Sequence, residues 1–201
     1  MKKTVLLGAA ALALTAMAFT SGDPLQIGSP MPKADLKLKD ISGKEIAMKD
    51  VKKDKGVLVM FSCNTCPYVI KNQERTIAIS EFAVKNNVGV IILNSNEAYR
   101  GNEDSFDAMK DYAKEQGYKW NYVVDANNEI ADAFGANRTP ECFLFNKDLK
   151  LVYHGAIDDN PSDATAVDKH HLKNAINELT AGKEITVKES RSVGCTIKRK
   201  G

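Results

Sequence analysis

Runs of apolar residues alternate along the chain with charged stretches, and the lengths of the runs predict strands and helices in turn. The runs 57–62, 88–93 and 142–145 are short and almost continuously apolar, which is typical of strands buried on both faces. Residues 34–38 alternate between apolar and polar, as a half-buried strand does. Shorter strands are predicted at 121–124 and 151–153, the latter joined to 142–145 by a polar turn.

Helices are predicted between these strands. The longest runs from Pro67 to about Lys85, and its expected buried face consists of Ile70, Ile77, Ala78 and Phe82, with Lys71, Gln73, Glu74 and Arg75 facing outward. A second covers about 105–116, capped by Asp104 or Ser105. A short helix follows Asp125 and ends before Gly135, and the last covers about 168–180.

Strands that alternate with helices and end in a hairpin and a helix predict an α/β fold, with a mixed central sheet covered on both faces. The first 18 residues have two lysines and then an apolar run, and Ala16-Met17-Ala18 fits a signal-peptidase cleavage pattern. We therefore expect a signal peptide at 1–18, a domain at 19–182 and a C-terminal tail at 183–201. An uncleaved membrane anchor is the alternative.

Cleavage predicts a periplasmic or secreted protein, without stable membrane insertion. The leader holds Lys2 and Lys3 and no acidic residue, so the mature chain has 26 basic and 26 acidic residues. This balance gives no indication of binding to nucleic acid or to an anionic membrane.

The sequence Cys63-Asn64-Thr65-Cys66 carries the strongest chemical signal. It follows a predicted buried strand and precedes Pro67, which suits the first turn of a helix. Positive charge at a helix N-terminus lowers a cysteine pKa, so we expect Cys63 to be a reactive thiolate and Cys66 to be the resolving thiol.

Zinc binding and a purely structural disulfide are the alternatives for this motif. A four-ligand zinc site usually has a second close pair of ligands, and Cys142 and Cys195 are isolated in the sequence. We therefore expect no metal at the motif.

Several motifs together resemble one known family. The CxxC after a long strand, Thr139-Pro140 before a later strand, and the final hairpin and helix are similar to the thioredoxin fold. Gly28-Ser29-Pro30 and the extra strand and helix between 88 and 117 resemble its redoxin branch. The peroxiredoxin-like group of the thioredoxin superfamily has the most similar sequence motifs, which here stand at 61–69, 139–141, 153–159 and 194–198. The resemblance covers about 26–198.

The resemblance implies a thioredoxin-like domain with an N-terminal redoxin-type extension. It also implies that Thr139-Pro140 is a cis-proline turn facing the two thiols, where the Thr139 backbone docks a partner strand. The ending Gly-Cys-Thr-Ile-Lys belongs to the group's pattern, which favours Cys195 as a third redox thiol. A bond to Cys142 and an exposed intermolecular thiol remain alternatives for Cys195, and Cys142 itself is expected to be a small buried hydrophobe.

Departures from the pattern weaken two activities. Peroxiredoxins have a proline and a threonine where this chain has Gly56 and Met60, so efficient peroxidase activity is not expected. Thioredoxins have a tryptophan where Ser62 stands and a buried acid where Val57 stands. Glu141, Asp158 or water is left to accept the proton, although either carboxylate is expected at the surface.

We therefore predict an exported thiol–disulfide oxidoreductase without an organic cofactor or a metal. Cys63 attacks a disulfide of a partner protein, Cys66 resolves the mixed disulfide, and an unidentified reductant or oxidant restores the pair. One alternative is a copper(I) metallochaperone that uses Cys63, Cys66 and His154. The other is a thiol peroxidase in which Cys195 resolves Cys63. His154 is otherwise expected to be a satisfied residue at the end of a strand.

Overall fold

The computed structural model describes residues 23–200, so the predicted signal peptide lies outside the described part of the chain. Five strands form the central sheet in the order β5-β4-β3-β7-β8. Strand β4 is parallel to its neighbours β3 and β5, whereas β7 is antiparallel to β3 and β8. Their bounds are Gly56–Ser62 for β3, Val88–Asn94 for β4, Asn121–Val124 for β5, Glu141–Asn146 for β7 and Leu151–Gly155 for β8.

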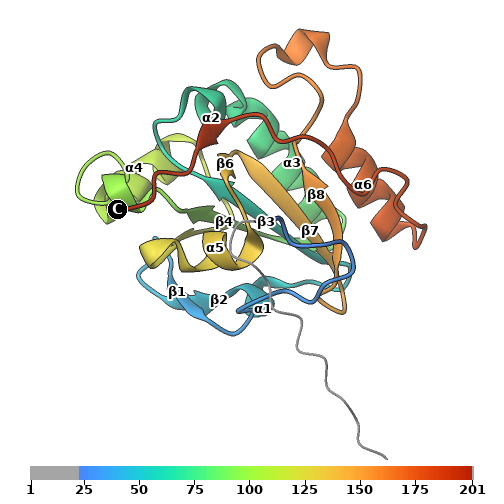
Figure 1. Ribbon diagram of the computed structural model, residues 1–201, viewed down its shortest axis with the longest axis horizontal. Helices are drawn as coiled ribbons and strands as arrows, with labels where there is room; N and C mark the ends of the chain where they lie inside the picture. The colour runs from blue at the N-terminus through green and yellow to red at the C-terminus, as the bar shows by residue number, and fades with distance from the viewer. Residues whose placement is uncertain (1–22, 201) are drawn as a thin grey trace, which may run out of the picture.

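Helices cover both faces of this sheet (Figure 1). One face packs on α1 (Met48–Val51) and α5 (Glu129–Phe134). The other packs on α3 (Gln73–Lys85), α4 (Phe106–Glu115) and α6 (His171–Thr180). Alternate residues of β3 enter the two cores, as the pleat of a strand requires. The mixed, doubly covered sheet predicted from the sequence is confirmed.

The predicted helix from Pro67 to Lys85 is divided at Asn72 into α2 (Pro67–Lys71) and α3. The Asn72 side-chain amide donates to the carbonyls of Tyr68, at 2.7 Å, and Pro161, at 3.1 Å. The predicted buried face is largely wrong as a result, although Phe82 packs partly buried against the core. Ile70 is 58% exposed, and α3 instead buries Gln73, Thr76, Ile79, Ser80 and Ala83. The prediction assumed one continuous helix, and the break at Asn72 changes which side chains of α3 face the core.

The strand predicted at 34–38 begins later, as β1 (Lys37–Lys39), and several other short elements were not predicted. Before β3, the hairpin of β1 and β2 (Glu45–Ala47) precedes α1. The two-residue strands β6 (Arg138–Thr139) and β9 (Cys195–Thr196) pair antiparallel. The described part of the chain also contains three 3₁₀ helices: η1 (Glu97–Tyr99), η2 (Ala126–Asn128) and η3 (Ala164–Ala166).

The C-terminal segment 183–200 lies along the domain (red in Figure 1). The His154 backbone N–H donates to the Lys188 carbonyl at 2.9 Å, and the Ser190 backbone N–H donates to the His154 carbonyl at 3.0 Å. The segment then crosses to β6 and forms β9. It therefore joins the edge near β8 to the end of β3, where the CxxC lies. Within residues 23–200, no helix is long and apolar enough to cross a membrane.

Candidate functional site

Cys63 lies directly after β3, the middle strand of the sheet. Because β3 is flanked on both sides and covered on both faces, all seven of its residues are buried. The Cys63 side chain is also fully buried, and it is one of two free cysteines among the described residues. Its sulfur lies 3.6 Å from the Thr139 hydroxyl oxygen.

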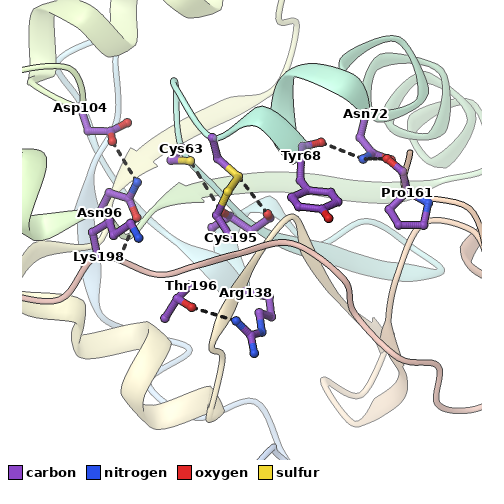
Figure 2. The surroundings of a disulfide bond; sticks show 12 residues. Cys63, Tyr68, Asn72, Asn96, Asp104, Arg138, Pro161, Cys195, Thr196 and Lys198 are labelled. Carbon is purple, nitrogen blue, oxygen red and sulfur yellow. Dashed lines mark hydrogen bonds between the residues drawn. A yellow bond between two sulfur atoms is a disulfide. The ribbon is translucent and has the colours of Figure 1, made fainter. Parts of the chain in front are cut away.

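Cys66 is the N-cap residue of α2, and Pro67 begins the helix. Its sulfur is bonded to that of Cys195, across a Cα–Cα distance of 6.1 Å. The Cys66 sulfur also lies 3.5 Å from the Thr139 carbonyl oxygen. Figure 2 shows the Cys63 sulfur beside this disulfide. The two cysteines of the motif are therefore not bonded to each other here: Cys66 is joined to the C-terminal segment.

Cys63, Cys66 and Cys195 all lie next to Thr139. Its side chain faces Cys63, its carbonyl faces Cys66, and its backbone pairs with Cys195 across the β6–β9 ladder. The Thr139–Pro140 peptide bond is cis, as the resemblance implies. Residues that are 76 and 73 positions from Thr139 thus converge on one turn.

Cys142 takes no part in this group. It is fully buried on β7, within the core formed by α3, α4 and α6, and it is free. The alternative of a Cys142–Cys195 disulfide is therefore wrong, and Cys142 is packed as a small hydrophobic residue. Burial holds the pKa of its thiol far above the usual range.

The expectation of a lowered Cys63 pKa is also wrong for this disulfide-bonded form. Burial raises the pKa of Cys63, and the hydrogen bond with Thr139 opposes the rise only in part. The N-terminus of α2 does not offset this effect of burial, because α2 begins only at Pro67 and has five residues. Cys63 lies three positions before the N-cap, whereas the effect of a helix dipole is confined to the first turn.

A buried carboxylate next to the motif was missed by the sequence analysis. Asp104 is fully buried. Its Oδ1 accepts hydrogen bonds from the Asn64 backbone, at 2.8 Å, and the Asn94 side chain, at 2.6 Å. Its Oδ2 accepts from the Asn96 side chain at 3.0 Å. Its negative charge is a further cause of the raised Cys63 pKa. Of the two predicted caps of α4, Ser105 is the one that caps the helix, accepting from the Ala108 N–H at 3.3 Å, which leaves Asp104 free to bind the motif.

The turn between the two cysteines is fixed by further bonds to Asn64. Its side-chain amide donates to the Glu103 carbonyl at 2.8 Å, and its side-chain oxygen accepts from the Tyr122 hydroxyl at 2.8 Å. Asn64 is itself only 7% exposed. The motif is thus held by the loop before α4 and by β5, both of which belong to the part of the chain between β4 and the cis-proline turn.

Glu141 and Asp158 are buried and not surface carboxylates as expected. Glu141 Oε1 lies 2.8 Å from His154 Nε2, and Oε2 accepts from the backbone N–H groups of Asn137, at 2.8 Å, and Arg138, at 3.0 Å. Asp158 binds the Arg75 guanidinium with both oxygens, each at 2.8 Å. Glu141 therefore fixes the backbone that leads into β6, and both carboxylates are bound to partners other than Cys63.

The ligands of the copper hypothesis are not assembled. His154 is paired with Glu141, and its ring stacks on Phe143 with the centroids 4.3 Å apart. Among residues 23–200, no three side chains of His, Cys, Asp or Glu are grouped in a way that could hold a metal ion. His154 is thus a satisfied residue of β8, as the simpler interpretation predicts.

Comparisons with known proteins identify the family. The family model described as Redoxin matches residues 26–175. The crystal structure of an uncharacterized conserved protein from Geobacillus kaustophilus is 33% identical, with a TM-score of 0.81 over 87% of this chain and 93% of that one. A hypothetical protein from Sinorhizobium meliloti 1021 is 28% identical, with a TM-score of 0.81 over 89% of this chain and 97% of that one.

More distant matches share the fold. A secreted Mycobacterium tuberculosis disulfide oxidoreductase is 13% identical, with a TM-score of 0.51 over 75% of this chain and 97% of that one. No curated protein matches the chain. The family match covers most of the chain and includes β3, the CxxC and the cis-proline turn, so this protein belongs to the Redoxin family and has a thioredoxin-like fold.

Proposed function

We propose that this chain is a thiol–disulfide oxidoreductase whose partners are protein thiols and disulfides. One observation carries the proposal: the free thiol of Cys63 and the Cys66–Cys195 disulfide lie against the same residue, Thr139. Thiol–disulfide exchange needs a thiol and a disulfide within reach of each other. Membership of the Redoxin family is consistent with this chemistry.

In the reducing direction, a dithiol reductant first reduces the Cys66–Cys195 disulfide and is itself oxidised. The Cys63 thiolate then attacks one sulfur of the partner's disulfide, and the other partner sulfur leaves as a thiolate. The Cys66 thiolate attacks Cys63 in this mixed disulfide, which releases the second partner thiol. The product is a Cys63–Cys66 disulfide, and the two electrons have passed to the partner. In the oxidising direction the same steps run in reverse.

Thr139 and Pro140 are proposed to dock the partner. The support is that the Thr139 backbone already pairs with an extended strand whose cysteine is bonded to Cys66. A partner strand in the same position would place its own cysteine next to the motif. Sulfur chemistry of this kind requires no organic cofactor and no metal.

We further propose that the protein is exported and works in the periplasm or outside the cell. The support is the leader pattern of residues 1–18, together with the disulfide, because disulfides persist in oxidising compartments. Expression with the native N-terminus, followed by N-terminal sequencing of the exported chain, tests this. A start near Phe19 is expected, and retention of Met1 in a cytoplasmic protein would contradict it.

Catalysed reduction of insulin disulfides by the full chain, with dithiothreitol as the electron donor, tests the activity. We expect Cys63→Ser to abolish the catalysed rate. The matched control is Cys142→Ser, which changes the other free cysteine and lies outside the thiol group, so its rate should equal that of the wild type. Equal rates for Cys63→Ser and the wild type would refute the proposal.

A further inference from the structure

The C-terminal strand occupies the edge at which the partner is proposed to dock. Residues 194–198, called the plug here, include β9, which pairs Cys195 with Thr139 and Thr196 with Arg138. Arg138 also donates from its guanidinium to the Thr196 hydroxyl at 2.8 Å. The only β6 residues available for a partner strand are therefore already paired with this chain's own terminus.

The plug is held along its length and not only by its disulfide. Ile197 is 3% exposed and packs into the core formed by α1 and α5. Its N–H donates to the Asn137 carbonyl at 3.1 Å. Lys198 donates its backbone N–H to the Asn96 side chain at 2.9 Å and accepts from the Ala98 N–H at 2.9 Å (Figure 2 shows Lys198 next to Asn96).

The plug also lies very close to the cis-proline turn at its first residue. A Cβ atom on Gly194 would lie 2.3 Å from the Thr139 carbonyl oxygen, a separation that real Cβ atoms essentially never show. A residue without a side chain is therefore needed for the plug to reach Thr139. A substitution there is expected to force the plug and the Thr139 turn apart without altering a cysteine.

We propose that the plug is a removable mimic of the partner strand, which closes the docking edge until the disulfide moves. The inference rests on the proposed function. The Cys63 thiolate attacks the Cys66 sulfur, so a Cys63–Cys66 bond forms and the Cys66–Cys195 bond breaks. Cys195 leaves as a thiolate and takes up the proton that Cys63 gave to solvent. The exchange is internal and needs no external oxidant or reductant.

Departure of the plug leaves a site of defined chemistry. It offers the Thr139 and Arg138 backbone for an extended strand, the motif sulfurs for a cysteine, and the apolar position of Ile197 two residues further on. The partner class is thus an extended protein segment with a cysteine followed, two residues later, by an aliphatic side chain. Main-chain pairing gives such a strand affinity, and the pocket for the alternate side chain gives it specificity.

The rate of Cys63 alkylation in the disulfide-bonded full chain tests the plug, with the Cys63 and Cys142 peptides separated by mass spectrometry. We expect Gly194→Ala to raise the Cys63 rate about tenfold or more, because its methyl group forces the plug off Thr139. The matched control is Gly101→Ala, where a Cβ would meet nothing within 4 Å, and its rate should equal the wild-type rate.

Hydrogen exchange in the wild type provides a second test that needs no variant. The amides of Ile197 and Lys198 should exchange at least about tenfold faster after the disulfide moves or is reduced. Equal Cys63 rates in Gly194→Ala and Gly101→Ala, or amides that stay protected after reduction, would overturn the plug. A fixed plug with normal insulin reduction refutes this inference alone, whereas a mobile plug without insulin reduction refutes the proposed function.

Discussion

The Asp104 carboxylate accepts a hydrogen bond from the Asn64 backbone at 2.8 Å, although the two residues are 40 positions apart. Asn64 lies between the two cysteines, so a buried negative charge is attached to the turn that presents Cys63. The Asp104 carboxylate has two separate effects on the motif. It fixes the backbone of the motif, and it disfavours the thiolate form of Cys63.

Asp104→Asn should therefore lower the pKa of Cys63 and reduce stability at the same time. The neutral side chain removes the charge, but its amide group faces the donor of Asn96. We expect the free energy of unfolding to fall by about 2 kcal/mol, the cost of leaving a buried polar group unsatisfied. The pH profile of Cys63 alkylation and urea unfolding measure the two effects.

Asp107→Asn is the control for that substitution, because the Asp107 side chain is exposed and pairs only with Lys110 at the surface. It should move neither the alkylation midpoint nor the unfolding curve. An unchanged Cys63 midpoint in Asp104→Asn would show that the carboxylate does not act on the thiol.

Stability at alkaline pH should depend on Cys63. Its pKa in the folded, disulfide-bonded form is raised above the unfolded value of about 8.5, so the folded state keeps the proton longer. The stabilisation is fully present below the unfolded pKa and is lost as the pH rises toward the folded pKa. Urea unfolding of the oxidised protein between about pH 7 and pH 10 should show a decline that is shallower in Cys63→Ser. Parallel declines would contradict the raised pKa.

Glu141→Ala should destabilise the fold by about 3 kcal/mol, because it leaves two backbone N–H groups and the His154 ring without their acceptor. Thermal unfolding measures the loss. Glu184→Ala is the comparison, since Glu184 forms an exposed pair with Lys188 and its removal should leave the melting temperature unchanged. Equal melting temperatures for the two variants would show that Glu141 does not hold the β6 backbone.

Cys142→Ala should cost about 1 kcal/mol, as small reductions of a buried side chain do, and it should leave the thiol chemistry intact. Cys142 belongs to the core on one face of the sheet, whereas Ile197 of the plug belongs to the core on the other face. The Cys66–Cys195 bond should form to the same extent in the variant, as measured by thiol trapping. A change in that extent would place Cys142 in the redox group.

Buried strands were the most predictable part of the fold. Strands β3 and β4 are continuous apolar runs, and such runs have few alternatives once turns bound them on both sides. The break at Asn72 was not predictable, because it depends on a bond to Pro161, 89 positions away. The buried face of α3 shifted with it.

The site was predictable where one local motif sufficed and not where distant residues meet. The CxxC and Thr139-Pro140 could be found from the sequence and the family resemblance. The Asp104 network could not, because an aspartate before a helix is also typical of a cap. Strand β9 has only two residues, so no periodicity reveals it. Its pairing with β6 depends on the fold as a whole.

A redox titration of the mature protein against glutathione, with thiol trapping and disulfide mapping at each potential, tests the central claim most directly. Cys63, Cys66 and Cys195 should behave as one exchange group, with Cys66 bonded to Cys195 in one oxidised form and to Cys63 in another. Cys142 should remain a thiol throughout. If no disulfide other than Cys66–Cys195 appears at any potential, or if Cys63→Ser leaves the distribution of disulfides unchanged, Cys63 is not part of the exchange and the account is wrong.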